Sequence, residues 1–281
     1  MTFVPTPLGN LRDITLRALD TLGACDLIVA EDTRTARKLL SALGLASKPV
    51  WSYREQNAAA ATAAILERAR VQLVAVVTDA GMPGISDPGR ELVAAARAAG
   101  VAVDVLPGPC AFVCAAVLSG FDIRRIAFEG FVPRARGERE RAFSRALASG
   151  AATAFYESPH RIVATLEHLD ALAPDAPTFL GRELTKHFEQ QIAGTPADVL
   201  RALERPVRGE IVLVLGPLAP RAHPDGDAAA PGELDAAIDA QLAAGASASG
   251  AAKALAALGL GDRAALYRRV AERKSGGGAD G

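Results

Sequence analysis

The chain has 281 residues, of which 50% are hydrophobic and only 5% are aromatic. This length suits one large domain or two modest ones with real cores. Lysine and arginine number 31 against 32 aspartate and glutamate residues, a formal net charge of −1. This balance excludes a globally basic nucleic-acid coat, but not a local basic patch. The sequence has no run of 18 apolar residues and no secretory leader pattern, so we expect a cytoplasmic protein without a membrane span.

Cysteine and histidine usage argues against cross-links and metal sites. The three cysteines, Cys25, Cys110 and Cys114, form no Cys-x-x-Cys pair, and the four histidines show no zinc-binding spacing. We therefore expect no structural disulfide and no metal, with the cysteines acting as small buried hydrophobes.

Short apolar runs alternate with alanine-rich helical segments over the first 217 residues. A short first strand over 1–4 comes first, and the further predicted strands are 27–30, 73–77, 102–106, 152–156, 178–180 and 210–215. The predicted helices are 14–22, 34–43, 58–68, 91–99, 161–172 and 196–203. This alternation is typical of α/β architecture with mainly parallel strands. Continuously apolar strands such as 73–77 predict a sheet that is covered on both faces.

Two breaks in the pattern suggest the domain organisation. Gly, Asp, Arg and Pro interrupt it near 118–136, and the strands that follow look partly antiparallel. A second break is rich in Pro, Gly, Ala and Asp. We therefore predict two α/β domains with a cleft between them, followed by a helix-turn-helix-like module of three short helices. The predicted segments are 1–118 and 119–217 for the domains, 218–232 for a linker, 233–273 for the module and 274–281 for a disordered tail.

Three Gly/Pro-rich turns each follow a predicted strand, over 4–10, 76–89 and 105–111. Ligands of open α/β sheets bind outside the carboxyl ends of the strands, and glycine lets backbone approach a ligand closely. Neither a G-x-G-x-x-G after the first strand nor a phosphate-binding P-loop is present. The turns favour a small-molecule site of another type.

The motifs VPTPLGNL, AEDTRTARKLL, TDAGMPGISDPG, LPGPCA, FEGFVP, FYESPHR and GRELTK follow one another in this order. Over residues 2 to about 217 the chain thereby resembles the ribosomal RNA small subunit methyltransferase I family of the tetrapyrrole-methylase (class III) superfamily, and the helical segment after it resembles the family's C-terminal appendage. The resemblance implies an S-adenosylmethionine-dependent enzyme and a homodimer. It also implies that the substrate is 16S rRNA of the small ribosomal subunit, methylated on the ribose 2′-oxygen of a decoding-region cytidine.

Two other functions stay open from the sequence. The first is a tetrapyrrole methyltransferase of the same fold. The arginine-rich residues 134–145 and the helical module argue against it, because a porphyrinoid substrate requires neither. The second is a noncatalytic RNA-binding assembly factor. The intact loop motifs argue against it, because such a protein does not require a cofactor site.

The resemblance also implies a set of cofactor-binding positions, which are Leu8, Gly9, Met82, Ile85, Cys110, Ala111, Tyr156 and Leu184. Met82 stands where relatives carry a small polar residue, so its contact must come from the main chain. A zwitterionic cofactor held largely by backbone N–H and C=O groups is consistent with such loops.

Methyl transfer to a ribose hydroxyl depends mostly on positioning, helped by a base or by a cation that steadies the alkoxide. Glu31 and Asp32, which end an apolar strand at the ligand-binding edge, and Lys186 in the motif GRELTK are the candidates. Carboxylates in such places also cap helices or pair with arginines. The identity of the base is left open.

Arginine suits phosphate recognition, and residues 134–145 contain five arginines and two glutamates. Such a run is also typical of a solvated helix face. After Ser247 there are six lysines and arginines against three acidic residues, which predicts an RNA-binding arm or, alternatively, a dimer brace. The candidate RNA-binding residues are Arg34, Arg134, Arg136, Arg139, Arg161, Arg182, Arg268 and Arg269.

Overall fold

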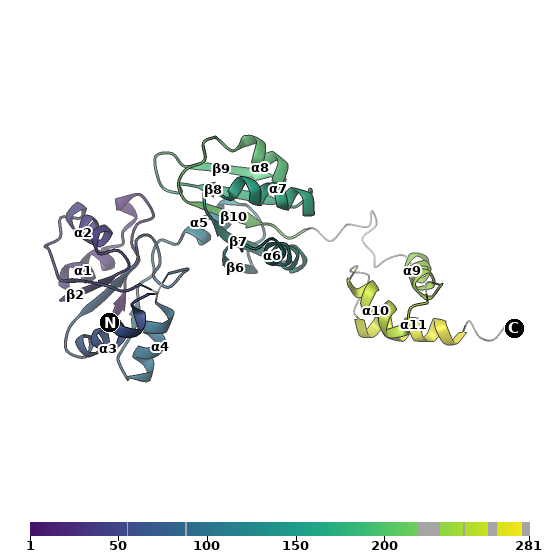
Figure 1. The fold of residues 1–281 in the computed structure, drawn as a ribbon, viewed down its shortest axis with the longest axis horizontal. Coiled ribbons are helices and arrows are strands. Elements are labelled where there is room, and N and C mark those ends of the chain that lie inside the picture. Colours follow the sequence, from purple (N-terminus) through teal and green to yellow (C-terminus); the bar gives the residue numbers. More distant parts are fainter. Residues whose placement is uncertain (55, 88, 219–230, 244, 258–262, 277–281) are drawn as a thin grey trace. The chain divides into compact units, whose positions relative to one another are not determined.

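The computed structural model of the chain describes residues 1–54, 56–87, 89–218, 231–243, 245–257 and 263–276. It divides into two compact units, Met1–Leu218 and Ala219–Gly281 (Figure 1). Most of the predicted linker, residues 219–230, lies outside the described residues. Within the described ranges, no helix is both long and apolar enough to cross a membrane.

The first sheet of Met1–Leu218 is entirely parallel, as its alternating sequence predicts. Its strands are β1 (Thr2–Phe3), β2 (Leu27–Ala30), β3 (Val50–Ser52), β4 (Val74–Val77) and β5 (Asp104–Val105), in the order β3-β2-β4-β1-β5. The short β1 lies inside the sheet, between β4 and β5, and not at an edge. The loops after β1, β4 and β5 therefore emerge side by side at the carboxyl edge.

Helices cover both faces of this sheet, which confirms the expectation from its continuously apolar strands. They are α1 (Leu16–Ala24), α2 (Thr33–Ala42), α3 (Ala58–Ala69) and α4 (Arg90–Ala98), and a short 3-10 turn, η1 (Leu11–Asp13), precedes them. Successive side chains of a strand point to opposite faces. Ile28 and Ala30 accordingly pack in one core with α1 and α2, whereas Leu27 and Val29 pack in another with α3 and α4.

The second sheet is mixed, as predicted. Its strands are β6 (Ile126–Phe131), β7 (Ala152–Glu157), β8 (Thr178–Arg182), β9 (Gln190–Gly194) and β10 (Ile211–Leu215), in the order β6-β7-β10-β8-β9. Only β6 and β7 pair in parallel, and the other neighbours are antiparallel. One face is covered by α6 (Arg136–Ala148), α7 (Ile162–Leu172) and α8 (Pro196–Ala202), whose apolar residues surround Phe155 and Leu213.

Helix α5 (Ala111–Leu118) covers the opposite face of the second sheet. Ala115 packs there against Val212 and Val214 of β10. The predicted boundary at residue 118 places this helix in the first domain, whereas the helix packs on the second sheet. The reason is its sequence, AFVCAAVL, which is apolar all round and needs a sheet to cover it.

The described part of Ala219–Gly281 forms α9 (Pro231–Ala243), α10 (Ala248–Ala257) and α11 (Arg263–Gly276). Ile238, Leu255 and Leu266 are among the buried residues of its core. The last helix runs to Gly276, so residues 274–276 are helical where a tail is predicted, while 277–281 lie outside the described residues.

Candidate functional site

The three loops at the carboxyl edge of the first sheet are joined to one another by backbone contacts. Thr6 and Gly81 exchange two hydrogen bonds, of 2.9 and 3.0 Å, and the Thr6 hydroxyl donates to the carbonyl of Thr78 at 3.3 Å. Gly108 lies so close to Pro5 that a Cβ on the glycine would lie 2.6 Å from the proline Cβ. The Gly/Pro-rich turns of the sequence thus form one connected floor.

A cavity of about 350 Å³ lies on this floor. Its walls come from the loops after β1, β4 and β5 and from the strand ends of the second sheet. Its volume falls in the range of small-molecule sites, about 300–1,000 Å³.

Seven of the eight predicted cofactor positions line this cavity. They are Leu8, Met82, Ile85, Cys110, Ala111, Tyr156 and Leu184. The eighth, Gly9, is exposed beside it. Residues that sequence reasoning did not single out also line it, and they include Asp79, Asp87, Phe131, Glu157 and Glu210. Asp87 lies in the motif TDAGMPGISDPG and Phe131 in the motif FEGFVP. Their position in these motifs is the only feature of the sequence that could have indicated a place in the site.

Carboxylates gather around Thr78 at the end of β4. The Thr78 hydroxyl donates to Asp87 at 2.8 Å and lies 3.5 Å from a carboxylate oxygen of Glu31. Burial raises the pKa of Glu31, and the nearby charges of Asp87 and Asp79 raise it further. Burial also raises the pKa of Asp87, although its hydrogen bond from Thr78 opposes the change. A cationic ligand in this cavity would relieve the repulsion.

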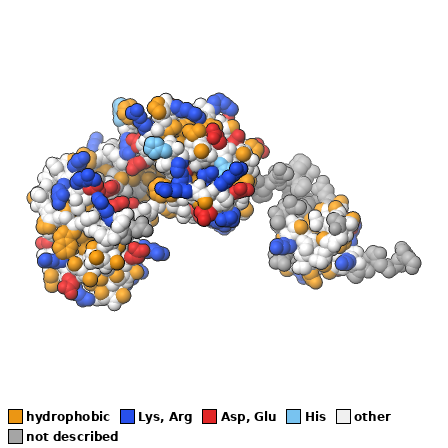
Figure 2. Space-filling view, viewed as in Figure 1, with side chains coloured by type: hydrophobic (Ala, Val, Ile, Leu, Met, Phe, Trp, Pro, Cys, Tyr) orange, Lys and Arg blue, Asp and Glu red, His pale blue; other side chains and the backbone are white. Residues whose placement is uncertain are grey.

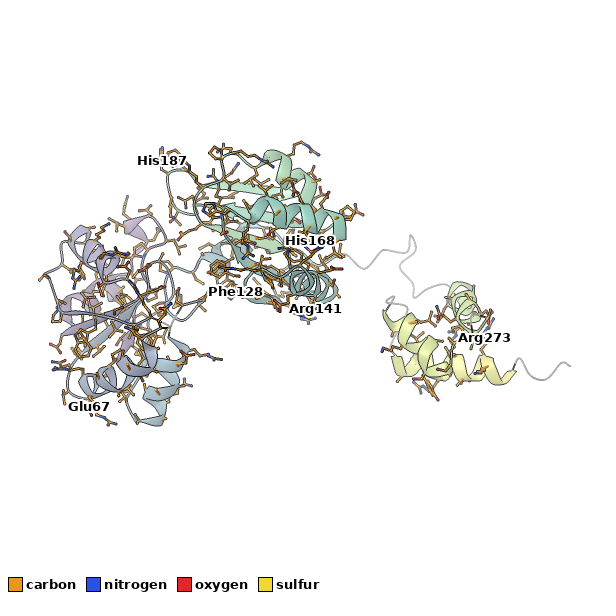
Figure 3. All side chains as sticks on the ribbon, viewed as in Figure 1. Glu67, Phe128, Arg141, His168, His187 and Arg273 are labelled. Atoms are coloured by element: carbon orange, nitrogen blue, oxygen red, sulfur yellow. The ribbon has the colours of Figure 1, made fainter. Side chains whose placement is uncertain are left out.

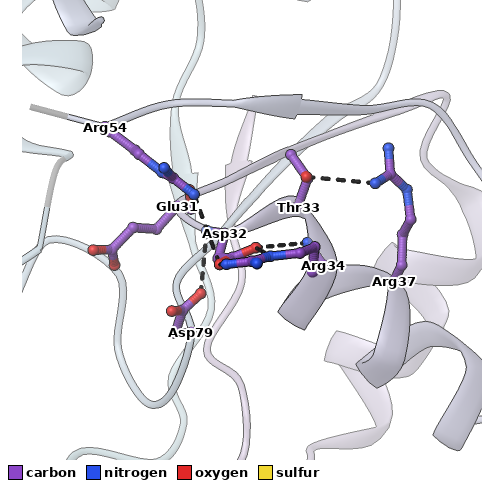
Figure 4. A network of polar contacts seen from close by, with 7 residues as sticks. All are labelled: Glu31, Asp32, Thr33, Arg34, Arg37, Arg54 and Asp79. Carbon is purple, nitrogen blue, oxygen red and sulfur yellow. Dashed lines mark hydrogen bonds and ion pairs between the residues drawn. The ribbon is translucent and has the colours of Figure 1, made fainter. Parts of the chain in front are cut away.

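Asp32 has a different environment, shown in Figure 4. It caps α2 by accepting from the amide of Arg34, and its carboxylate pairs with the Arg34 guanidinium at 2.6 Å and with Arg54 at 3.7 Å. These hydrogen bonds hold the pKa of Asp32 far below its usual range. This is the helix-capping role that the sequence left open, and Asp32 and Arg34 are engaged with each other.

Lys186 lies between β8 and β9, with its side chain 27% exposed. Its Nζ donates to Glu183 and to Glu210, both at 2.8 Å. Its stem rests on Gly9, where a Cβ would lie 2.1 Å from the lysine Cγ. Burial opposes the charge, but the two carboxylates outweigh it and raise the pKa of Lys186. The side chain is therefore a fixed cation and not a proton acceptor.

Backbone strain concentrates at this cavity. In the described residues, three side-chain-bearing residues have a positive φ, namely Ser86 at 61°, Glu183 at 52° and Thr185 at 67°. Ser86 lines the cavity, and the other two flank its lining residue Leu184. The Oγ1 of Thr185 is also buried without a hydrogen-bond partner. Strain of this kind costs about 1–3 kcal/mol per residue and clusters at functional sites.

Two of the predicted RNA-binding arginines have structural partners instead. Arg161 pairs at 2.9 Å with Glu157, whose buried carboxylate also accepts from Thr165. Arg182 is 7% exposed and donates to Gln190 and Glu204. Both guanidinium groups thus have protein partners, and Arg182 is buried, whereas the Arg161 side chain is 27% exposed.

The remaining candidates lie on α6, on the segment before it, and in the helical module. Arg134 and Arg136 are exposed, whereas Arg139 is half-buried and donates to His168 of α7 at 2.8 Å. Figure 2 shows basic side chains interspersed with acidic ones over α6, and Figure 3 places Arg141 there and Arg273 in the module. Arg268 is exposed, but Arg269 pairs with Asp235 at 3.1 Å, a contact that joins α11 to α9.

Comparison of the sequence with known proteins shows which family the chain belongs to. The model of the tetrapyrrole (corrin/porphyrin) methylases matches residues 1–200. A ribosomal RNA small subunit methyltransferase I of Mesorhizobium japonicum is 39% identical over 98% of this chain and 92% of its own length. The chain belongs to this methyltransferase family. The enzyme of the same name from Streptococcus pyogenes is 37% identical over 95% of the chain and 92% of its own length.

A solved structure titled as a diphthine synthase shares the fold, with a TM-score of 0.60 and 16% identity over 76% of this chain and 89% of its own. Together with the family model it confirms the predicted α/β class. The family resemblance of the sequence is confirmed as well.

We expect Gly108→Ala to weaken cofactor binding at least tenfold while the chain stays folded. The new Cβ would meet Pro5, whose ring is fixed to the backbone, so the loops after β1 and β5 must move apart. Gly23→Ala is the matched control, because a Cβ there has its nearest neighbour at 3.8 Å. Calorimetric titration with S-adenosylmethionine measures the effect. Equal affinities for the two variants would contradict the prediction that the three joined loops form the floor of the cofactor site.

We expect Asp87→Asn to raise the melting temperature of the ligand-free chain at pH 7 by a few degrees. The pKa of Asp87 is higher in the native state than its ordinary value of 3.8. Between these two pKa values the native state binds more protons than the unfolded state, so the stability of the wild type falls as pH rises from 3.8 to the native pKa. The difference between variant and wild type should therefore shrink as pH falls toward 4. Asp20→Asn, at an exposed helix position, is the control. A variant that melts below wild type at pH 7 would contradict this account.

Proposed function

We propose that this chain transfers a methyl group from S-adenosylmethionine to the ribose 2′-oxygen of a cytidine in the decoding region of 16S rRNA, in the cytoplasm and without a metal. The observation that carries the proposal is the similarity to enzymes named ribosomal RNA small subunit methyltransferase I over nearly the whole chain. It is supported by a cavity of suitable volume at the edge where the family motifs converge.

The residues present fit S-adenosylmethionine. This cofactor carries positive charge on its sulfonium and its ammonium group, and the cavity offers half-buried carboxylates at Asp87 and, behind Thr78, at Glu31. Leu8, Ile85 and Leu184 add apolar surface for its adenosine. When bound, the cofactor supplies an activated methyl group, and the chain contributes position and charge.

Two groups next to the cavity are candidates for assisting the acceptor hydroxyl. Lys186 is held as a cation, which suits an alkoxide or the neighbouring phosphate. Glu31 has a raised pKa, which suits a proton acceptor. Asp32 is occupied by its arginines and is left out of the mechanism.

The RNA-facing surface of the proposal consists of exposed arginines, namely Arg134, Arg136 and Arg268. Arg34 pairs with Asp32, but its side chain is 80% exposed and adds to this surface, and Arg269 pairs with Asp235. Exposed arginine side chains can neutralise phosphates without reading sequence, so this surface would position the RNA.

A homodimer is part of the proposal. Helix α5 exposes Val113, Val117 and Leu118 by 47%, 63% and 42%, although its other side packs on the second sheet. Val113 and Val117 lie one helical turn apart, so they form a continuous apolar strip that a second copy would cover.

The function is tested with small ribosomal subunits from cells that lack this gene. Incubation with the purified chain and labelled S-adenosylmethionine should place one methyl group on a ribose of the decoding region, located by mass spectrometry of nuclease fragments. A porphyrinoid that accepts the methyl group while subunits do not would favour the tetrapyrrole alternative. Binding to subunits without any transfer would favour the noncatalytic one.

We expect Lys186→Met to lower kcat at least tenfold while the affinity for cofactor stays within about twofold, because methionine keeps the apolar stem that rests on Gly9 and removes only the cation, which does not line the cavity. Lys186→Arg keeps the charge and is the control. Single-turnover rates at saturating subunit concentration separate this effect from binding. Unchanged turnover would show that Lys186 serves only to hold Glu183 and Glu210.

We expect a chain ending at Leu218 to fold, because Met1–Leu218 has its own cores. Its cofactor affinity and oligomeric state should be unchanged, since the cavity and the apolar strip on α5 both lie within it. Its affinity for small subunits should fall and depend less steeply on salt, because the basic residues of α11 are lost. Sedimentation and salt-dependent binding measure both, and a monomer with unchanged subunit affinity would identify the module as a dimer brace.

A further inference from the structure

We propose that Phe131 is the platform on which the base of the target nucleotide stacks, so that it positions the acceptor ribose at the cavity. This inference rests on the proposed function. Phe131 lines the cavity and is 57% exposed, in contrast to the aromatic residues behind it. A single exposed phenylalanine is ordinary on a protein surface, but the backbone and the packing that hold this one set it apart.

An irregularity in β6 turns Phe131 toward the cavity. Phe128 pairs with Ala154 of β7, and Phe131 pairs with Tyr156, so two residues of β6 stand opposite one residue of β7. Gly130, inside this bulge, has a φ of 71°. In a regular strand Phe131 would point to the face opposite Phe128. The extra residue returns it to the same face, which is how bulges re-aim side chains near active sites.

Packing on both sides agrees with this geometry. The rings of Phe128 and Phe131 both meet Tyr156 edge-on, with centroids 4.9 and 5.7 Å away. Phe128 in turn stacks on Phe112 of α5. The next residue, Val132, points the other way and is buried in the core beneath α6 and α7. Phe131 is therefore the outermost ring of an aromatic stack that begins inside the protein.

The backbone at Phe131 is fixed as well as aimed. The amide of Val132 donates to the carbonyl of Tyr156 at 3.0 Å, and the carbonyl of Val132 accepts from Arg161. Arg161 is itself held by the buried carboxylate of Glu157. An aromatic ring on so rigid a support loses little conformational freedom when a flat group stacks on it.

The charges around the ring select the part of a nucleotide that it can receive. Asp87 lines the same cavity, and its carboxylate would repel a phosphate, whereas the carboxylate of Glu210 is paired with Lys186. A nucleobase is flat and uncharged, and stacking on an aromatic side chain suits every base. The base and the ribose 2′-oxygen belong to one nucleotide, so a ring on the rim of the cavity can hold the first while the second enters.

The test compares Phe131→Ala with Phe131→Tyr, which keeps a ring, and with Phe188→Ala, a control at a 72% exposed phenylalanine that does not line the cavity. Methyl transfer to small subunits, calorimetric cofactor affinity and sedimentation are measured for each. Phe131→Ala should raise KM for the subunit about fivefold to 100-fold, as expected for the loss of one stacked base. Its cofactor Kd should stay within about twofold, and the other two variants should resemble wild type.

Three results would overturn the inference. An unchanged KM for the subunit means that no base stacks there. A loss confined to cofactor affinity means that the ring covers the cofactor instead. A change of oligomeric state means that it belongs to a subunit interface. A wild-type chain that fails to methylate subunits removes the proposed function itself, a result distinct from an active wild type and an unaffected alanine variant.

Discussion

The pair of hydrogen bonds between Thr6 and Gly81 is the contact on which the site depends. It joins the loops after β1 and β4, two neighbouring strands whose paired residues, Thr2 with Ala75 and Phe3 with Val76, are 73 positions apart in the chain. With Pro5 resting on Gly108, it adds the loop after β5 to the same floor. The helices packed on both faces of the sheet support this floor.

That support allows the site to keep groups that oppose folding. Glu31 and Asp87 share Thr78 as a neighbour and are partly buried with raised pKa values. Strained backbone at Glu183 and Thr185 lies on the opposite wall. None of these features stabilises the ligand-free chain, and a cation between the carboxylates would reverse their effect. The groups that would bind the ligand therefore lower the stability of the ligand-free chain, as is common at active sites.

Sequence periodicity was sufficient for most elements, and its failures have physical causes. The predicted strand 27–30 is observed as β2, because a run of four apolar residues between turn signals is typical of a fully buried strand. Strand β6 was missed, since its bulge and Gly130 disrupt the alternation that marks a strand. The family motifs located the cavity. They could not show that Arg182 is buried or that Arg269 is paired with Asp235, because such partners come from elements distant in sequence.

The two sheets divide the work according to their construction. The parallel sheet contributes to the cavity through loop backbone and through carboxylates at strand ends, features that suit a small cationic cofactor. The mixed sheet contributes side chains, from the bulged end of β6 and from the turn that carries Lys186. Changes in the second sheet can alter what meets the cofactor without disturbing the floor that holds it. The proposed platform for the base, Phe131, belongs to the second sheet, so in this proposal recognition of the acceptor is structurally separate from the floor of the first sheet.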